Sequence, residues 1–101
     1  MKTITEAWGA LKLANGTEID LDGDQCTVFL PANNPKVYDT RDVAAAIATL
    51  NIPVVHIGEE EIGSDAHCVF VADGCEHIFD ANENPIVMQT MLARLNAFLA
   101  Q

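Results

Sequence analysis

Apolar and charged residues alternate on both sides of Asn15-Gly16, which is the pattern of a half-buried β-hairpin. A three-residue loop that ends at Gly16, in the left-handed region, would place Leu11 opposite Ile19 and Lys12 opposite Glu18. Apolar then faces apolar and charge faces opposite charge, whereas a two-residue Asn-Gly turn would mix the two faces. The sequence therefore predicts a hairpin from about residue 11 to residue 21 with this register.

A second hairpin is predicted around Asp73-Gly74, with strands at Cys68–Ala72 and Cys75–Phe79. Two further apolar-rich runs indicate strands at Cys26–Leu30 and Val54–Ile57. A turn is expected at 22–24 and a loop at 31–35, where Gly, Pro and Asn gather. The first eight residues are compatible with either a strand or a short helix.

Two helices have clear start signals. Asp39 or Thr40 can cap a helix that runs to about Leu50, where Asn51 is suited to a left-handed stop. Asn84 can cap a second helix, with Pro85 at its first position, that runs to about residue 99. Both segments have an apolar stripe at helical spacing, so each is expected to pack on a core.

These elements predict an α+β fold with an antiparallel or mixed sheet of about five to six strands. The expected order is a hairpin, with or without a further strand, then helix, strand, hairpin and helix, with both helices on one face. The chain has 101 residues, which is the usual size of one domain, so residues 1–101 are expected to form one.

Acidic residues outnumber basic ones by 15 to 5, which gives a formal net charge of -10. Binding to nucleic acid phosphates depends on Lys and Arg, so direct nucleic acid binding is not expected. A basic protein is the partner that such a surface would attract.

The cysteine count and the apolar runs bear on location. The three cysteines are an odd number without a small-domain framework, which argues against a disulfide scaffold. The N-terminus lacks the apolar stretch of a signal peptide, and no run reaches the ~20 residues of a membrane span. A cytoplasmic protein is the resulting expectation.

Two acidic clusters in connecting segments are the candidate binding residues. They are Asp20, Asp22 and Asp24 in the first, and Glu59, Glu60, Glu61 and Asp65 in the second. The first cluster resembles the opening of a calcium loop, but its Gly is fourth instead of sixth and Pro31 stands where Glu is required. If the two clusters meet on one edge, they form a focused negative patch.

A weaker candidate is a metal site in the second hairpin. A three-residue-loop register would turn His67, Cys75 and His77 to one face, as a zinc ligand set requires. The spacing is not a zinc signature, and no cofactor is predicted. No cue for a lowered thiol pKa accompanies Cys68 or Cys75, so both are expected to be buried structural thiols, and no catalytic residue is assigned.

The main hypothesis is a small acidic protein-binding module without enzymatic activity. It would inhibit or regulate a basic partner of the nucleic-acid-binding or nuclease type. One alternative is a metal-binding or enzymatic domain that uses the second hairpin. Another is a structural subunit that completes its core as a homodimer or larger homo-oligomer. The acidity is also compatible with a role in solubility alone.

Overall fold

A computed structural model describes residues 3–31, 34–58, 67–82 and 84–101. Within these ranges the chain is α+β, as predicted, with seven strands and two α-helices. In chain order the elements are β1 (Ile4–Leu13), β2 (Glu18–Gly23), β3 (Gln25–Phe29), β4 (Lys36–Asp39), a 3-10 turn (Thr40–Asp42), α1 (Val43–Leu50), β5 (Val54–Ile57), β6 (His67–Ala72), β7 (Cys75–Asp80) and α2 (Pro85–Leu99).

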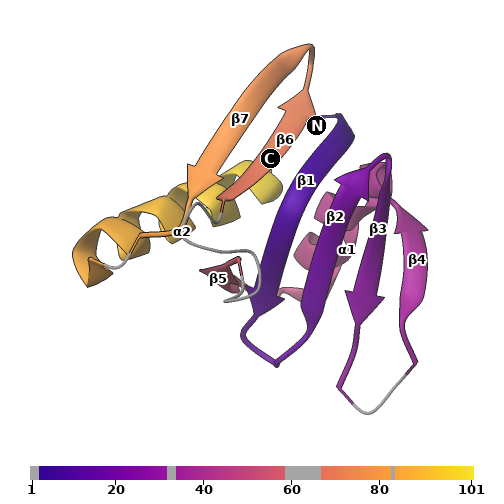
Figure 1. The fold of residues 1–101 in the computed structure, drawn as a ribbon, viewed down its shortest axis with the longest axis horizontal. Coiled ribbons are helices and arrows are strands. Elements are labelled where there is room, and N and C mark those ends of the chain that lie inside the picture. Colours follow the sequence, from indigo (N-terminus) through magenta and orange to yellow (C-terminus); the bar gives the residue numbers. More distant parts are fainter. Residues whose placement is uncertain (1–2, 32–33, 59–66, 83) are drawn as a thin grey trace.

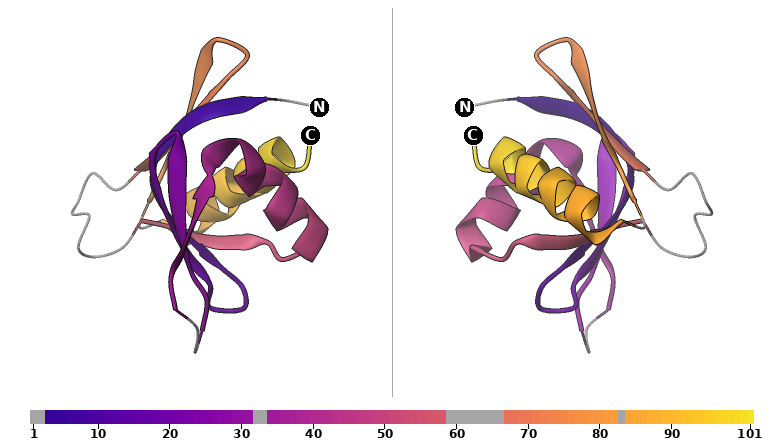
Figure 2. Two further views of the ribbon diagram at one scale, coloured as in Figure 1. Left: turned by 90° about the vertical axis from the view of Figure 1, so that its right-hand side faces the viewer. Right: turned by 90° about the vertical axis from the view of Figure 1, so that its left-hand side faces the viewer.

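The strands form one antiparallel sheet in the order β4-β3-β2-β1-β6-β7, and β5 pairs with β1 outside this path. The long strand β1 lies in the middle (Figure 1). One of its edges pairs with β2, while the other pairs with β6 near its start and with β5 near its end. Both helices lie on the same side of the curved sheet (Figure 2). Among the described residues, the sheet therefore has an inner face covered by helices and an outer face without one.

The first hairpin has the register that the sequence predicts. Leu11 lies opposite Ile19 and Lys12 opposite Glu18. The amide of Leu13 donates to the carbonyl of Thr17 at 2.8 Å, so the loop between them has three residues. Gly16 ends that loop with φ +89°, which supplies the left-handed position. The match of apolar and charged faces was therefore sufficient to fix this register.

The predicted helix signals are also confirmed. The Asp39 carboxylate accepts a hydrogen bond from the Arg41 amide at the start of the 3-10 turn that leads into α1. Asn51 ends α1 in the left-handed region with φ 53°. The Asn84 side chain accepts from the amide of Ile86 at 3.0 Å, with Pro85 as the first residue of α2. No helix in the described residues is both long enough and apolar enough to span a membrane.

Two parts of the sheet were not clear from the sequence. The ambiguous N-terminal segment is the first half of β1, with Ile4 and Ala7 buried in the core. Strand β4 was not predicted because its residues are mostly exposed and follow a Pro-rich loop. It forms through pairing with β3, where Tyr38 lies opposite Cys26.

Strands β1 and β6 approach each other closely at Gly9. The glycine has φ +126°, a conformation that residues with a side chain rarely adopt. A Cβ at this position would lie 2.5 Å from the carbonyl oxygen of His67 and 2.8 Å from the Cα of Cys68. A register shift between Ile4 and Glu6 accompanies this crossing. Glycine is therefore required at position 9 on both conformational and steric grounds.

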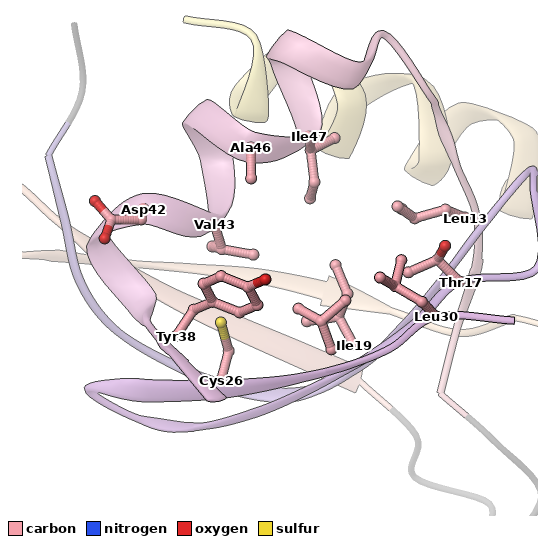
Figure 3. A pocket seen from close by; sticks show the side chains of 11 residues that line it. Leu13, Thr17, Ile19, Cys26, Leu30, Tyr38, Asp42, Val43, Ala46 and Ile47 are labelled. Carbon is pink, nitrogen blue, oxygen red and sulfur yellow. The ribbon is translucent and has the colours of Figure 1, made fainter. Parts of the chain in front are cut away.

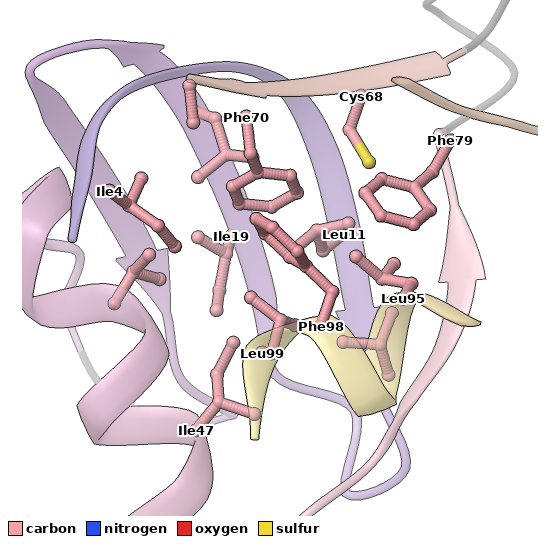
Figure 4. Packing of buried hydrophobic residues seen from close by; sticks show 14 of the residues in the cluster. Ile4, Leu11, Ile19, Ile47, Cys68, Phe70, Phe79, Leu95, Phe98 and Leu99 are labelled. Carbon is pink, nitrogen blue, oxygen red and sulfur yellow. The ribbon is translucent and has the colours of Figure 1, made fainter. Parts of the chain in front are cut away.

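The core lies between the inner face of the sheet and the two helices (Figure 4). Phe70, Phe79 and Phe98 are centred there, with ring centroids 5.5 Å apart for the Phe70–Phe98 and Phe79–Phe98 pairs. The Phe70 and Phe79 rings meet edge to face at 6.1 Å. This cluster joins β6, β7 and α2, and the residues of the predicted stripe on α2 contribute Leu95 and Phe98 to it.

Strand β5 is also held by the side chain of Asn96 from α2. The Asn96 amide accepts from the Val54 backbone N–H at 2.8 Å and donates to the Val54 carbonyl at 3.0 Å. It also donates to the carbonyl of Leu92 at 2.9 Å. One side chain thus replaces the hydrogen bonds that a neighbouring strand would give to Val54.

Candidate functional site

The outer face of β2 carries a row of carboxylates, which we call the carboxylate row: Glu18, Asp20 and Asp22. They alternate with the buried Ile19 and Leu21, so all three point away from the core. Successive members are separated by roughly 7 Å, the length of two strand residues. Partial burial raises the pKa of the Asp20 carboxyl, and the negative charge of Glu18 raises it further. The row therefore carries like-charge repulsion, which the Lys12 ammonium, 3.8 Å from the Glu18 carboxylate, relieves only at one end.

A second row crosses the same face, and we call it the apolar row: Trp8, Val69 and Ile78. Trp8 of β1 lies opposite Val69 of β6, and Val69 lies opposite Ile78 of β7. Trp8 is 42% exposed and Ile78 is 52% exposed. Side chains of directly opposed residues are in contact range on one face of a sheet. Three strands thus combine to present large apolar side chains to solvent.

Carboxylates surround the apolar row. Asp22 lies opposite Trp8 at one end of it. At the other end, Glu76 and Asp80 lie two residues before and after Ile78 on β7. A parallel line of residues runs from Glu6 to Val71 to Glu76. Lys12 is the one lysine or arginine within β1, β2, β6 and β7, so this part of the outer face is strongly negative.

The predicted acidic clusters are placed only in part. Asp20 and Asp22 lie within strand β2, in the carboxylate row, and not in a connecting segment as expected, whereas Asp24 does lie in the exposed turn between β2 and β3. Glu59, Glu60, Glu61 and Asp65 lie outside the described residues. The meeting of the two clusters therefore stays a prediction. The apolar row was missed because Trp8 fell in the ambiguous segment and the partners of Val69 depend on strand order.

The predicted alignment of His67, Cys75 and His77 on one face is wrong. Asp73 and Gly74 form a two-residue turn, with φ 53° and 77°, in place of the assumed three-residue loop. Cys75 and His77 therefore share the inner side of the hairpin, and the His77 ring lies 4.8 Å from that of Phe98. His67 lies opposite Asp80 on the outer side. Among the described residues no three His, Cys, Asp or Glu side chains form a metal-binding group.

The cysteines differ in burial. Burial and, to a smaller extent, the charge of Asp80 raise the pKa of the Cys68 thiol to about 12. Burial followed by the charges of Asp39 and Asp42 raises the pKa of the Cys26 thiol. Both thiols are therefore neutral at physiological pH and behave as apolar side chains. Cys75 is exposed, contrary to the expectation that it is a buried structural thiol.

Asp39 is the carboxylate with the clearest pKa shift. Two hydrogen bonds from the Arg41 guanidinium, at 2.9 Å and 3.0 Å, and one from the Arg41 amide lower its pKa to about 2. This value lies below the ~3.9 of an unfolded Asp. The ion pair therefore stabilises the folded chain above about pH 4, and its contribution is lost as the pH falls towards 2.

A carbon-detected NMR titration would measure this pKa. In an Arg41→Gln variant we expect the Asp39 pKa to rise but to stay below the unfolded value, because the Arg41 amide still donates. An Arg94→Gln variant removes an equal charge elsewhere and should leave the midpoint unchanged. An Asp39 midpoint near 4 in the wild type would contradict the ion pair.

Searches against protein family models, curated protein sequences and solved structures find no match to this chain.

Proposed function

We propose that this chain is a protein-binding module that uses the outer face of β2, β1, β6 and β7 to bind a basic protein. The observation that carries the proposal is the exposed apolar row, Trp8, Val69 and Ile78, with carboxylates at both ends. Binding sites commonly have an apolar centre with an aromatic anchor and a polar rim. The outer face has this composition.

The charge of the rim selects the kind of partner. Lys and Arg side chains on a partner would pair with Asp22, Glu76 and Asp80 while its apolar residues cover Trp8. A further cation near Asp20 would also relieve the repulsion between Glu18 and Asp20 that remains beside the Lys12–Glu18 ion pair. A second copy of this chain would bring like charges together, so the face is better suited to a basic protein than to a homodimer.

The same chemistry supports a regulatory role as part of the proposal. Proteins that bind nucleic acids carry Lys and Arg side chains that contact phosphates. A surface with carboxylates around an apolar centre would compete for those side chains. We therefore propose a nucleic-acid-binding or nuclease-type protein as the partner, which this chain would inhibit or regulate.

Affinity capture from the native host cells, followed by titration of the captured protein, tests the proposal. We expect a basic protein whose dissociation constant rises steeply with salt. Trp8→Ala should weaken binding by about tenfold or more, as expected for an aromatic anchor. Asp20→Asn with Asp22→Asn should weaken it and reduce its salt dependence.

The matched control is Asp42→Asn with Asp73→Asn, which removes two charges outside the carboxylate row. This variant should bind nearly as well as the wild type. Circular dichroism checks that each variant keeps its melting temperature. Equal losses in the control and the Asp20/Asp22 variant, or an affinity that does not depend on salt, would contradict the proposal.

A further inference from the structure

A cavity of about 260 Å³ lies on the inner side of the sheet, between α1 and strands β2, β3 and β4. Its wall is formed mostly by apolar side chains, among them Ile19, Val28, Val43 and Ile47. Figure 3 shows Thr17 and Asp42 well separated across it, with Tyr38 and Cys26 nearer Asp42. This cavity is on the opposite side of the sheet from the proposed protein-binding face.

The volume limits what the cavity can hold. An engineered apolar cavity of roughly 150 Å³ binds benzene, which has six non-hydrogen atoms. By the same ratio, this cavity accommodates a molecule of about ten non-hydrogen atoms. The apolar wall favours a hydrocarbon body over a polar one. Three lining residues, Tyr38, Asp42 and Ala46, are exposed to solvent, so the cavity has an accessible side.

One polar atom in the wall has no hydrogen-bond partner among the described residues. Thr17 is only 2% exposed, and its hydroxyl oxygen Oγ1 is buried and unpaired. Leaving such a group unsatisfied is unfavourable, because burial removes the hydrogen bonds that water would give it. Oγ1 has almost no surface open to the cavity, so the Thr17 side chain would rotate about its Cα–Cβ bond to meet a ligand hydroxyl and so recover the lost hydrogen bond.

Negative charge at the end of the cavity away from Thr17 excludes one large class of apolar ligands. Asp42 lines the cavity, and Asp39 lies close enough to affect the neighbouring Cys26 thiol. A fatty acid or another carboxylate would be repelled by Asp42, whereas the Arg41 guanidinium already neutralises Asp39. The thiol itself is neutral and contributes apolar surface. The preferred ligand therefore carries no negative charge.

We propose that this cavity binds a small uncharged molecule with an apolar body and one hydroxyl group, which hydrogen-bonds to Thr17. The closest simple probe is p-cresol, and toluene is the matched molecule without the hydroxyl. Both can be titrated into labelled protein while the backbone amide shifts of Val28 and Val43 are followed by NMR. We expect p-cresol to bind more tightly than toluene, with shifts centred on the cavity.

Two variants separate the cavity from non-specific binding. Ala46→Phe adds a bulky side chain at the exposed rim and should weaken both probes by about tenfold, since it occupies the ligand's space. Ala45→Phe is the control, because Ala45 is exposed on the same helix but does not line the cavity. It should leave both affinities unchanged. Equal effects of the two variants would overturn the proposal.

Thr17→Val tests the hydroxyl directly. It should reduce the preference for p-cresol over toluene by about tenfold, the value of one buried hydrogen bond. It should leave the melting temperature equal or higher, because it removes an unpaired buried group without changing the side-chain shape. An unchanged preference, a large fall in melting temperature, or no shifts at Val28 and Val43 with p-cresol would overturn the proposal.

Discussion

Replacing Gly9 by Ala is expected to lower the free energy of unfolding by on the order of 4 kcal/mol. The added Cβ would lie 2.5 Å from the His67 carbonyl oxygen and 2.8 Å from the Cα of Cys68. Both are backbone atoms, so β1 and β6 must separate to make room. The φ of +126° adds conformational strain to this clash. The total free energy of unfolding of a domain of this size is roughly 5–15 kcal/mol, so the loss is a large part of its stability.

Chemical denaturation measures this loss, and two other glycines provide the controls. Gly23 and Gly74 also have positive φ, +71° and +77°, but a Cβ at either meets no atom within 4 Å. Gly23→Ala and Gly74→Ala should therefore cost only the conformational term, about 1 kcal/mol each. If Gly9→Ala costs no more than these two, the close approach of β1 and β6 is incorrect.

Replacing Asn96 by Leu is expected to cost about 3 kcal/mol. Leu has a similar size but leaves the N–H and the carbonyl of Val54 without the hydrogen bonds that Asn96 provides. Both groups are partly buried beside α2, so the loss exceeds that of a solvent-exposed hydrogen bond. The exchange of the Val54 amide hydrogen with solvent should also become faster, because this amide is left unbonded.

Thr90→Val on the same helix is the matched control. Thr90 is exposed, and its hydroxyl donates to the Ile86 carbonyl, which remains in the helix. Its replacement should change the free energy of unfolding by less than about 0.5 kcal/mol. A loss of similar size in both variants, or an unchanged Val54 exchange rate in Asn96→Leu, would argue against the bridge.

Much of the fold could be predicted because local signals and burial patterns agree. The first hairpin has only one register in which Leu11 faces Ile19 and Lys12 faces Glu18. Asn51 marks a helix end by its left-handed backbone, and the Asn84-Pro85 step marks a helix start by the side-chain cap of Asn84. Strand β4 has no such local signal. Its Val37 and Tyr38 are exposed, so they give no burial pattern, and the strand forms through its pairing with β3.

The candidate sites depend on contacts between distant residues. The spacing of Glu18, Asp20 and Asp22 already places them on one face of a strand. The apolar row, in contrast, combines Trp8 with Val69 and Ile78 through a strand order that no local pattern shows. The predicted alignment of His67 with Cys75 and His77 was wrong for a local reason, because Asp73-Gly74 forms a two-residue turn that places His67 on the other side.

The central position of β1 has a consequence for how the chain folds during synthesis. β1 to β4 can pair in succession as soon as they leave the ribosome, but the second edge of β1 waits for β5 and β6. Ile4 pairs with Ala72, so this contact spans most of the chain and slows folding. Until β5 and β6 pair with β1, this open edge of β1 can pair with other nascent chains. The interval before residue 72 emerges is therefore the period of greatest aggregation risk.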